Sequence, residues 1–472
     1  MKKLLLSLGA ISVGAALITP KIIASNVQTN INTIVEQVNA LPGYNASVSE
    51  LHSAWFDTNA KVLVSFDMAG LGADLPAEAS EKFENLAVEI AVNASHGPIL
   101  MAGEHSFGLA NISIAVANEE LRKHIDWANN LPLYGVESHI DIFGNTSYTD
   151  NIQAFTVVEQ EEGVDINFAG YQGSGAFENG EWQYTGQSKN TIIKTENGDV
   201  VIGAMDVDMT VASSFIDMMK SGFYDSDSSF TIRSINFEDD NSENKVLANN
   251  IYIKANSKIN TEKNTGDIGI TYGLDSLTTA DFKAEDVALA IEINNISQAF
   301  IEAYQQNVNE LSVGTEAEIQ AKLLQFAETH LLSLLKAEPE MNVTSLRGTL
   351  AQGTFDSSIN TRLAGIDALP DLLTDVQFWL SHALANGQLK GDKAVIEYLA
   401  AKVMESQLKQ NPQTAEMSAE EIEQIAMQQA PQFLQNFVQQ GLLVSNDKQY
   451  STTFALKDKA LTINDKPIPL PL

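Results

Sequence analysis

The chain is constrained most strongly by a long series of segments in which apolar and polar residues alternate. Between residues 41 and 294, apolar side chains recur at every second position, as at Val62, Val64 and Phe66. This spacing puts them on one face of a β-strand, because successive side chains of a strand point to opposite faces. The alternation recurs from Leu86 to Val92, Ile112 to Val116, Ile251 to Ala255, Ile268 to Leu274 and Val287 to Ile293.

Strands with one apolar face and short connections predict a large antiparallel sheet. Turn residues separate the segments at Glu178-Asn179-Gly180, at Asn197-Gly198-Asp199 and from Asp239 to Lys245. We expect one clear helix within this part, near Glu119 to Asn130, and a shorter one from Ala212 to Lys220. A sheet of this length must curl, close or be covered, because a flat open sheet would present long unpaired edges.

The pattern changes after Asn295, where helical periodicity becomes frequent. Two capping boxes, Thr315 with Glu318 and Ser418 with Glu421, predict helix starts. The second helix should kink at Pro431 and end at Gly441. Further helices are expected over Ile296–Asn307, Leu369–Ala385 and Lys393–Gln410, and strands over Met341–Thr361, Tyr450–Leu456 and Leu461–Ile463.

These patterns predict an α+β fold in three parts. Residues 1–40 form a membrane anchor with a helical stalk, residues 41–295 form a large curved antiparallel sheet, and residues 296–472 form a helix-rich part packed on that sheet. Because no Pro- or Ser-rich linker separates the last two parts, one continuous body is an alternative to two domains.

The anchor is predicted from an uncharged apolar run between Leu4 and Thr19, preceded by Lys2 and Lys3. A spanning helix needs about 20 apolar residues, so the run must extend through Ile22-Ile23-Ala24. The positive residues before it favour an N-terminus in the cytoplasm. The helical stripe Val27, Ile31, Ile34, Val35 and Val38 continues beyond it as a stalk.

A cleaved secretory signal ending at Ala24 is the alternative interpretation. No clean Ala-x-Ala triplet precedes Ser25, which favours retention of the helix. Both interpretations place most of the chain beyond a membrane. We therefore expect a single N-terminal anchor, with the bulk of the chain outside the cytoplasm.

Charge and cysteine content exclude several classes of function. The chain has 61 acidic and 28 basic residues, a net charge of −33. Such a field repels phosphate backbones, so no nucleic-acid partner is expected. The absence of cysteine from the sequence excludes disulfides, thiolate metal sites and cysteine nucleophiles.

The histidines and aspartates offer few candidates for a metal site. His96 and His105 flank a predicted turn near Glu104, and a hairpin could bring them together around a metal, although a turn-shaping role for His96 is favoured. Asp225, Asp227 and Ser229 begin like a calcium loop, but Phe230 and Asn236 stand where glycine and glutamate are needed.

Other polar and aromatic motifs also have plain structural interpretations. Gly173-Ser174-Gly175 is not a nucleophile elbow and suggests a bulge or turn. Asp206 and Asp208 are interpreted as a solvated strand face, and Trp182 beside Tyr184 as core or a binding surface. No catalytic, cofactor-binding or metal residues are assigned, and no cofactor is expected.

Several local strings occur in a fixed order along the chain. They are His96-Gly97-Pro98-Ile99-Leu100, Leu334 to Met341, Val343 to Leu346, Gly441 to Val444 and Leu461 to Pro467. Together with the N-terminal anchor, these strings resemble the YdgA family of bacterial envelope proteins, a domain of unknown function. The resemblance covers nearly the whole chain and implies a bacterial inner-membrane protein with a single N-terminal anchor and a periplasmic body, with no catalytic residues.

The expected function is non-enzymatic: the anchored protein binds an envelope protein or an apolar or lipid ligand. A structural homo-oligomer, such as a homodimer, is the first alternative. A hydrolase that acts on an envelope polymer through paired carboxylates is the second. The deciding feature is whether the apolar face of the sheet is filled by the C-terminal helices or open.

Overall fold

The computed structural model describes residues 27–40, 43–66, 87–97, 99–116, 121–123, 125–159, 163–213, 223–239, 245–311, 315–410 and 417–470. The predicted membrane helix in residues 1–26 lies outside these ranges, as does most of the helix expected from Ala212 to Lys220. No helix in the described ranges is long and apolar enough to cross a membrane. The chain divides into two compact units, Met1–Glu243 with Asn307–Ser312, and Asn244–Gln306 with Val313–Leu472.

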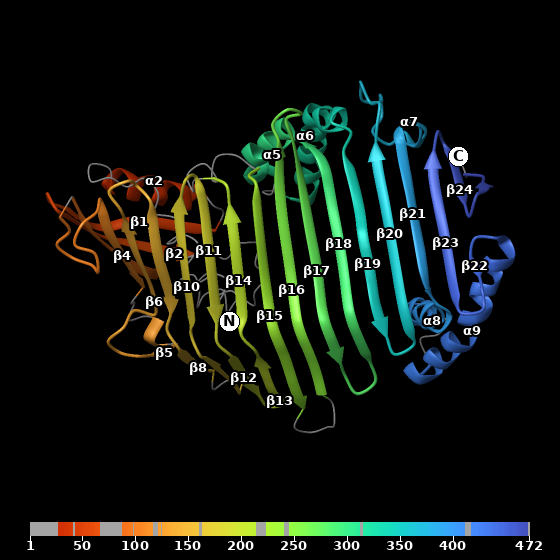
Figure 1. Ribbon diagram of the computed structural model, residues 1–472, viewed down its shortest axis with the longest axis horizontal. Helices are drawn as coiled ribbons and strands as arrows, with labels where there is room; N and C mark the ends of the chain where they lie inside the picture. Colours follow the sequence, from red (N-terminus) through yellow and green to blue (C-terminus); the bar gives the residue numbers. More distant parts are fainter. Residues whose placement is uncertain are drawn as a thin grey trace. The chain divides into compact units, whose positions relative to one another are not determined.

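The first unit is an antiparallel meander in which three pairs of neighbouring long strands are separated in the sequence by one or two short strands. The main order is β1-β2-β3-β4-β6-β7-β10-β11-β14-β15 (Figure 1). The strands are β1 Tyr44–Ser53, β2 Asp57–Phe66, β3 Ala87–His96, β4 Ala110–Val116, β6 Tyr134–Ile140, β7 Thr146–Ile152, β10 Tyr171–Glu178, β11 Glu181–Ser188, β14 Met205–Val211 and β15 Ser226–Asp239.

A second set of short strands continues the long strands past a common break. The order there is β5-β8-β9-β12-β13-β15, and β15 spans both sets. The breaks between β7 and β8, β9 and β10, β11 and β12, and β13 and β14 are each two residues long and lie at the same level, and at one of them Gly170 adopts φ +103°. The short strands are β5 Asp126–Trp127, β8 Phe155–Glu159, β9 Val164–Phe168, β12 Thr191–Thr195 and β13 Gly198–Ile202.

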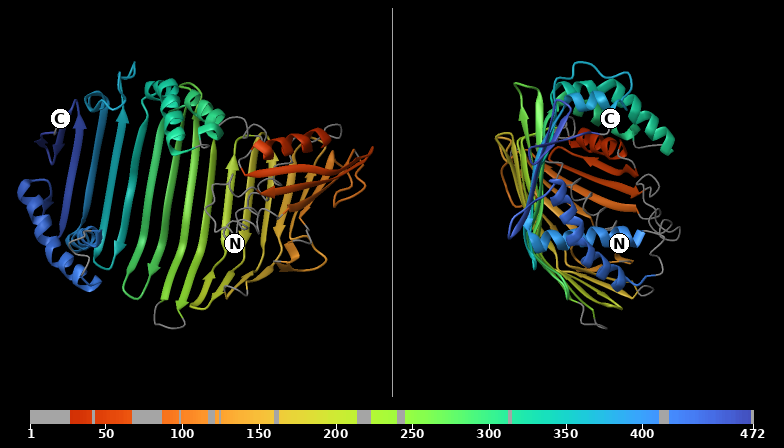
Figure 2. Two further views of the ribbon diagram at one scale, coloured as in Figure 1. Left: turned by 180° about the vertical axis from the view of Figure 1, so that it is seen from behind. Right: turned by 90° about the vertical axis from the view of Figure 1, so that its right-hand side faces the viewer.

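The sheet of the first unit has one apolar and one polar face, as the alternation predicts. Val64, Val92 and Ile114 are almost fully buried on the apolar face. Helix α2 (Val27–Ala40) packs on this face beside β1 and β2, and its Ile31 joins the core (Figure 2). A helix is therefore present where the helical stripe from Val27 to Val38 predicts one, but it packs on the sheet and does not stand apart from it as a stalk.

The second unit is also an antiparallel meander, in the order β16-β17-β18-β19-β20-β21-β23-β24-β25 (Figure 1). The short strand β22 pairs with β23. The strands are β16 Lys245–Asn260, β17 Thr265–Thr278, β18 Lys283–Ser297, β19 Glu340–Leu350, β20 Gly353–Leu363, β21 Ala383–Asp392, β22 Val444–Ser445, β23 Gln449–Lys457, β24 Ala460–Ile463 and β25 Lys466–Ile468.

In the described part of this unit, five helices connect the strands, and both predicted capping boxes are confirmed. The helices are α5 Gln298–Leu311, α6 Glu316–Lys336, α7 Val376–His382, α8 Lys393–Gln410 and α9 Ala419–Gln440. Thr315 caps α6 and Ser418 caps α9, each with the reciprocal glutamate bond. Gly441 ends α9 in the left-handed conformation, φ 74°, as expected.

The helix expected near Glu119 to Asn130 is wrong. The described residues of this segment form a 3-10 turn, η1 (Leu121–Lys123), and the short strand β5. The guanidinium of Arg122 donates to the carbonyl oxygens of Trp127 and Ala128 at 3.1 and 3.3 Å and lies 3.7 Å over the Trp127 ring. Because the arginine satisfies these carbonyls, the backbone does not need helical bonds there.

Two other helix boundaries also differ from the prediction. Strand β18 extends through Ser297, so α5 begins two residues later than expected. The helix expected over Leu369–Ala385 is reduced to α7, because Pro370 precedes it and the Asp375 side chain caps the amides of Gln377 and Phe378. Strand β21 then begins at Ala383.

Candidate functional site

The sheet of the second unit carries a continuous apolar face over its first five strands. Cross-strand neighbours align in rows on this face, as Ile253, Tyr272 and Leu289 do across β16, β17 and β18. From the first to the fifth strand the distance is about 19 Å at the usual spacing of the strands. We call this set the apolar band: Ile253, Tyr272, Leu289 and Leu346; Ala255, Ile270, Ile291, Val343 and Ile359; and Ile268, Ile293 and Met341.

The middle of this face is uncovered, whereas its two ends are buried. The exposed fractions of Met341, Tyr272 and Ile253 in the band are 58%, 43% and 42%. Towards one end of the strands, Leu350 is only 8% exposed, and towards the other Ile296 is 6% exposed. A contiguous exposed apolar surface of this kind is uncommon on a protein that has no ligand or partner.

Two pairs of helices bound the apolar band (Figure 2, right). At one end of the strands, Val395 and Ile396 of α8 and Leu434 of α9 bury Ala284 and Leu350. At the other end, α5 and α6 pack on each other through aromatic side chains, Phe300 and Phe326, whose ring centres are 5.6 Å apart. Figure 2 shows both pairs on the same side of this sheet.

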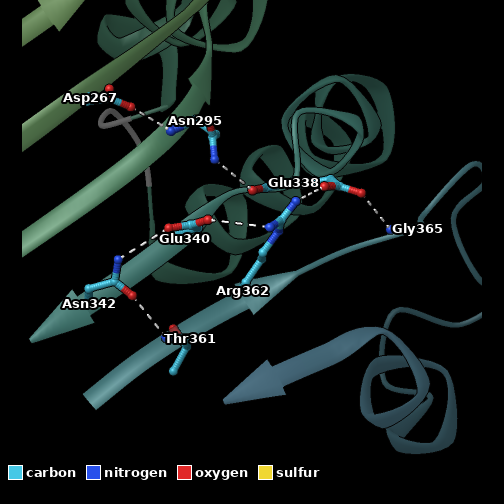
Figure 3. Close-up of polar contacts among 8 residues, drawn as sticks. All are labelled: Asp267, Asn295, Glu338, Glu340, Asn342, Thr361, Arg362 and Gly365. Carbon is cyan, nitrogen blue, oxygen red and sulfur yellow. Dashed lines mark hydrogen bonds and ion pairs between the residues drawn. The ribbon is translucent and has the colours of Figure 1, made fainter. Parts of the chain in front are cut away.

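A polar cluster fixes the point where α6 leads into β19 (Figure 3). The guanidinium of Arg362 forms an ion pair with Glu338 and lies 3.8 Å from Glu340. The Asn295 side chain donates to the backbone carbonyl oxygen of Glu338 at 3.3 Å. Glu338 itself has φ 56°, so these contacts hold an unusual backbone conformation at the elbow.

The same cluster ties the elbow to three strands. The backbone amide of Asn295 in β18 donates to Asp267 of β17 at 2.8 Å, and that of Thr361 in β20 donates to Asn342 of β19 at 3.1 Å. The ion pair between Glu338 and Arg362 holds the pKa of Glu338 below its usual value. The cluster therefore keeps one border of the apolar band in place.

The first unit contains a buried cluster of tyrosines around one carboxylate. The Tyr184 hydroxyl donates to both carboxylate oxygens of Asp150, at 3.1 and 3.2 Å, and bonds the Tyr171 hydroxyl. The rings of Tyr148 and Tyr184 lie nearly parallel, 9° apart, and Trp182 lies parallel to both. Trp182 and Tyr184 are thus half-buried parts of the core of the first unit.

Glycines form the floor of this cluster, and the expectation of a turn or bulge at Gly173-Ser174-Gly175 is wrong. These residues lie inside β10, paired with β7 and β11. A Cβ atom on Gly175 would meet the Tyr148 ring, and one on Gly186 would meet the Tyr171 ring. Glycine is needed here because the aromatic rings lie flat against the strands.

Burial changes the acidity of this cluster. Asp150 is 5% exposed, and burial raises its pKa to about 6 despite the hydrogen bonds from Tyr184 and Tyr134. Burial also raises the pKa of Tyr171 to about 12. The pKa values of Tyr148 and Tyr184 are raised for the same reason.

The opposite face of the same strands forms a polar hollow of roughly 700 Å³. Asp206 and Asp208 line it, so they do lie on a polar strand face, as predicted. Asp206 is held by Arg233 at 2.7 Å and by the Gln187 amide at 2.6 Å, and these bonds lower its pKa. The other side-chain positions in the hollow are occupied by hydroxyl and amide residues, Thr149, Asn151, Gln172, Ser174 and Thr185.

This distribution of carboxylates is poorly suited to glycosidic chemistry. A general acid needs a raised pKa, and it must face the same cleft as its partner. Asp206 has a lowered pKa because of Arg233. Asp150 has a raised pKa, but its carboxylate points to the tyrosine cluster on the other face.

The structure separates the two histidines that the sequence placed near a turn. The His96 ring lies on the apolar face, 3% exposed, with its Nε2 3.2 Å from the Thr58 hydroxyl. It therefore bonds a side chain of a neighbouring strand and not the local backbone. His105 instead stacks on His139, with ring centres 4.1 Å apart, and His139 bonds Asn111.

The acidic segment that begins like a calcium loop is a strand. Asp227 and Ser229 lie in β15, paired with Thr210 and Asp208 of β14. An extended strand cannot wrap around an ion as a calcium loop does. Among the described residues, no group of three or more histidine, aspartate or glutamate side chains has a geometry suited to a metal ion.

Sequence comparison gives a family but no function. A family model described as a bacterial protein of unknown function, DUF945, matches residues 1–471. This confirms the resemblance to a YdgA-like family of unknown function. No curated protein and no solved structure matches the chain.

Proposed function

The chain belongs to the DUF945 family of bacterial proteins of unknown function, and we propose that it is a non-enzymatic binding protein of the cell envelope. The apolar band of the second unit is its binding surface. The ligand is a lipid or another molecule with a long apolar part. A single N-terminal helix anchors the protein in the inner membrane, with the bulk of the chain in the periplasm.

The observation that carries this proposal is the exposure of the apolar band. Five of its side chains are 38–58% exposed in the middle of the sheet, whereas the same face is buried under α8 and α9. Exposing a large apolar side chain costs about 1.5–3 kcal/mol relative to burying it. A ligand that covered Tyr272, Leu346 and Ile359 would recover part of that free energy.

The surroundings of the band suit a ligand that is apolar along its length. Its rows contain aliphatic side chains and one tyrosine, and charged side chains such as Lys254 and Glu292 belong to the opposite face. The helix pairs at the two ends leave a surface of limited length. Such a surface favours acyl chains, or the apolar face of a peptide, over sugars or nucleotides.

The chemistry of the polar hollow supports a non-enzymatic role. Asp206 forms an ion pair with Arg233. The carboxylate with the raised pKa, that of Asp150, is enclosed by tyrosines. These are the features of a structural network. A hydrolase would instead present a protonated acid and an ionised partner to one cleft.

The location rests on the sequence before α2. The apolar run from Leu4 to Thr19, the lysines before it and the positive-inside tendency support an N-terminal anchor. Helix α2, which begins at Val27, follows this run directly. N-terminal sequencing of the mature protein tests the anchor: a start at Ser25 would refute it.

Two pairs of adjacent residues give a matched test of the ligand proposal. Leu346 and Ile359 belong to the apolar band, whereas Ser345 and Ser358 precede them on the opposite face. We expect Leu346→Glu and Ile359→Glu to reduce the lipid that copurifies with the full chain by at least about tenfold, because a buried unpaired charge costs more than 1.4 kcal/mol. Ser345→Glu and Ser358→Glu should retain it.

Native mass spectrometry of the purified full-length protein provides the readout. Lipid bound to the wild type and to both serine variants, but not to the band variants, supports the proposal. A wild-type protein that carries no lipid contradicts it. Dimers that dissociate in the band variants would instead assign the band to self-association, and sedimentation of the same samples distinguishes this outcome.

A further inference from the structure

Three neighbouring connections of the first unit present large apolar side chains to solvent at one end of the sheet. They join β1 to β2 at residues 54–56, β3 to β4 at residues 97–109, and β6 to β7 at residues 141–145. The pairing order β2-β3-β4-β6 places them side by side. The apolar tip consists of Trp55, 90% exposed, Phe143, 84%, Met101, 75%, Phe107, 71%, Ile142, 61%, and Ile99, 57%.

Hydrogen bonds tie two of these connections to the neighbouring strands. The His96 amide donates to the carbonyl oxygen of Phe56 at 2.9 Å, which joins the first connection to β3. The Leu109 amide donates to the carbonyl oxygen of Ile140 at 2.8 Å, which joins the second to β6. The apolar tip is therefore one surface with a defined shape.

Internal bonds satisfy the polar groups of these connections. Asn111 donates to the carbonyl oxygens of Ala102 and His105, each at 2.7 Å. The Asp141 carboxylate accepts the amides of Phe143 and Asn145, at 2.8 and 3.0 Å. These bonds lower the cost of moving the connections into a less polar environment.

The exposed side chains are too numerous and too close together for an ordinary surface. Single exposed apolar residues are common, but a cluster of large ones marks a contact surface. Exposure of each costs about 1.5–3 kcal/mol relative to burial. The bonds that position the connections keep these side chains outward, where contact with another apolar phase recovers that free energy.

The shape and charge of the tip fit a lipid bilayer. The side chains stand on the ends of hairpins, so they project and do not line a groove. Residues 53–57, 97–109 and 141–145 contain no lysine or arginine, and their acidic residues are Asp57, Glu104 and Asp141. Such a surface has no attraction for anionic lipids, and tryptophan and phenylalanine favour the interfacial zone of a bilayer.

The position of the tip in the chain points to the same partner. Helix α2 packs beside β1 and β2, the hairpin whose turn carries Trp55 (Figure 2). The predicted membrane helix directly precedes α2. Because α2 ends beside the start of β1, where Asn39 bonds Ala46 at 2.9 and 2.6 Å, its first residues point towards the β1–β2 turn.

We propose that the apolar tip inserts into the interface of a bilayer of zwitterionic phospholipids. Together with the N-terminal helix, it would give the first unit a second contact with a membrane and fix the orientation of its sheet. The proposal concerns a surface separate from the apolar band and does not depend on lipid binding there.

The absence of cysteine from the sequence permits a direct test. Phe143→Cys places a single fluorescent label at the tip, and Asn197→Cys places one in the β12–β13 turn at the other end of the same sheet. Both side chains are exposed, so both labels leave the core unchanged. The full-length labelled proteins are reconstituted in phosphatidylcholine vesicles, with nitroxide-bearing lipid or aqueous iodide as the quencher.

The expected result is severalfold stronger quenching of the label at position 143 by the lipid quencher than of the label at position 197, and the reverse order with iodide. Equal iodide quenching at both positions would overturn the proposal. Protection at position 143 that disappears when the protein is diluted in lipid would also overturn it, because it would assign the tip to a second copy.

A further pair of variants separates this proposal from the function of the apolar band. Ile359→Glu, added to the Phe143→Cys protein, should leave the quenching pattern unchanged. Trp55→Ser together with Phe107→Ser should reduce lipid quenching at position 143 and preserve the lipid that copurifies with the band. If Ile359→Glu abolished the quenching difference, the tip would not be an independent membrane contact.

Discussion

At the scale of single residues, the tyrosine cluster shows that large aromatic side chains need glycine at the positions they pack against. Gly186 in β11 leaves room for the Tyr171 ring, and the Tyr171 hydroxyl bonds Tyr184. Tyr184 then donates to the buried carboxylate of Asp150, which Tyr134 also bonds. The cluster therefore depends on glycines whose sequence context suggests only flexibility.

Replacement of Gly186 tests this dependence. Gly186→Ala puts a Cβ atom against the Tyr171 side chain, and we expect it to lower the free energy of unfolding by about 1–3 kcal/mol. In a Tyr171→Leu background the same change should cost less, because the colliding ring end is gone. Urea unfolding of the four proteins in this cycle measures the coupling, and equal costs in both backgrounds would contradict the account.

The raised pKa of Asp150 predicts a specific dependence of the protein's stability on pH. Its pKa is raised to about 6 in the folded state, so the folded protein holds the proton more tightly than the unfolded chain does. Its contribution to stability is greatest below the unfolded pKa and falls by up to about 3 kcal/mol as pH rises through 6. Asp150→Asn should remove this loss.

Asp206 provides the control for that titration. Arg233 lowers its pKa, so its contribution is present above the unfolded pKa and is lost as pH falls. Denaturant unfolding at pH 4.5 and pH 8 should therefore show a pH effect of Asp150→Asn and almost none of Asp206→Asn, because both pH values lie above the unfolded pKa of Asp206. The same pH effect from both variants would show that burial of Asp150 does not set its acidity.

At the scale of elements, much of the fold follows from patterns that are local in the sequence. The alternation around Ile114 and Ile291 specifies strands, and the boxes at Thr315 and Ser418 specify helix starts. The segment after Leu121 departs from its helical pattern because the Arg122 side chain donates hydrogen bonds to the backbone carbonyl oxygens of Trp127 and Ala128. Such a contact leaves no periodic signal.

The candidate site was less predictable than the strands that form it. Alternation identifies the apolar faces of β16 to β20, but an apolar face that is covered and one that is open have the same sequence pattern. Whether Leu350 or Tyr272 is buried depends on where α8 and α9 pack. The flat packing of Tyr148 over Gly175 is likewise a contact between two different strands. No local motif in the sequence predicts it.

Helix α9 tests the energetic value of a predicted cap. The Ser418 hydroxyl accepts the Glu421 amide, and Ser418→Ala should lower the free energy of unfolding by about 1 kcal/mol. Ser333 is a control within α6, where its hydroxyl only donates to the His330 carbonyl oxygen at 2.7 Å. Thermal unfolding should show a loss for Ser418→Ala alone, and equal effects of both changes would contradict the role of the cap.

At the scale of the whole molecule, each unit is a two-faced antiparallel sheet in a strongly acidic chain. The first unit covers its apolar face with α2 and its own aromatic side chains, whereas the second leaves the apolar band half exposed. The net charge of −33 keeps the polar faces solvated and away from anionic surfaces.

Site-specific photo-crosslinking in living cells tests the central claim most directly. A photoreactive amino acid at position 359 lies in the apolar band, and one at position 358 lies on the opposite face of the same strand. The account predicts that the full-length protein becomes covalently linked to lipid at position 359 and not at position 358. Lipid adducts that are absent at both positions, or equally abundant at both, would contradict it.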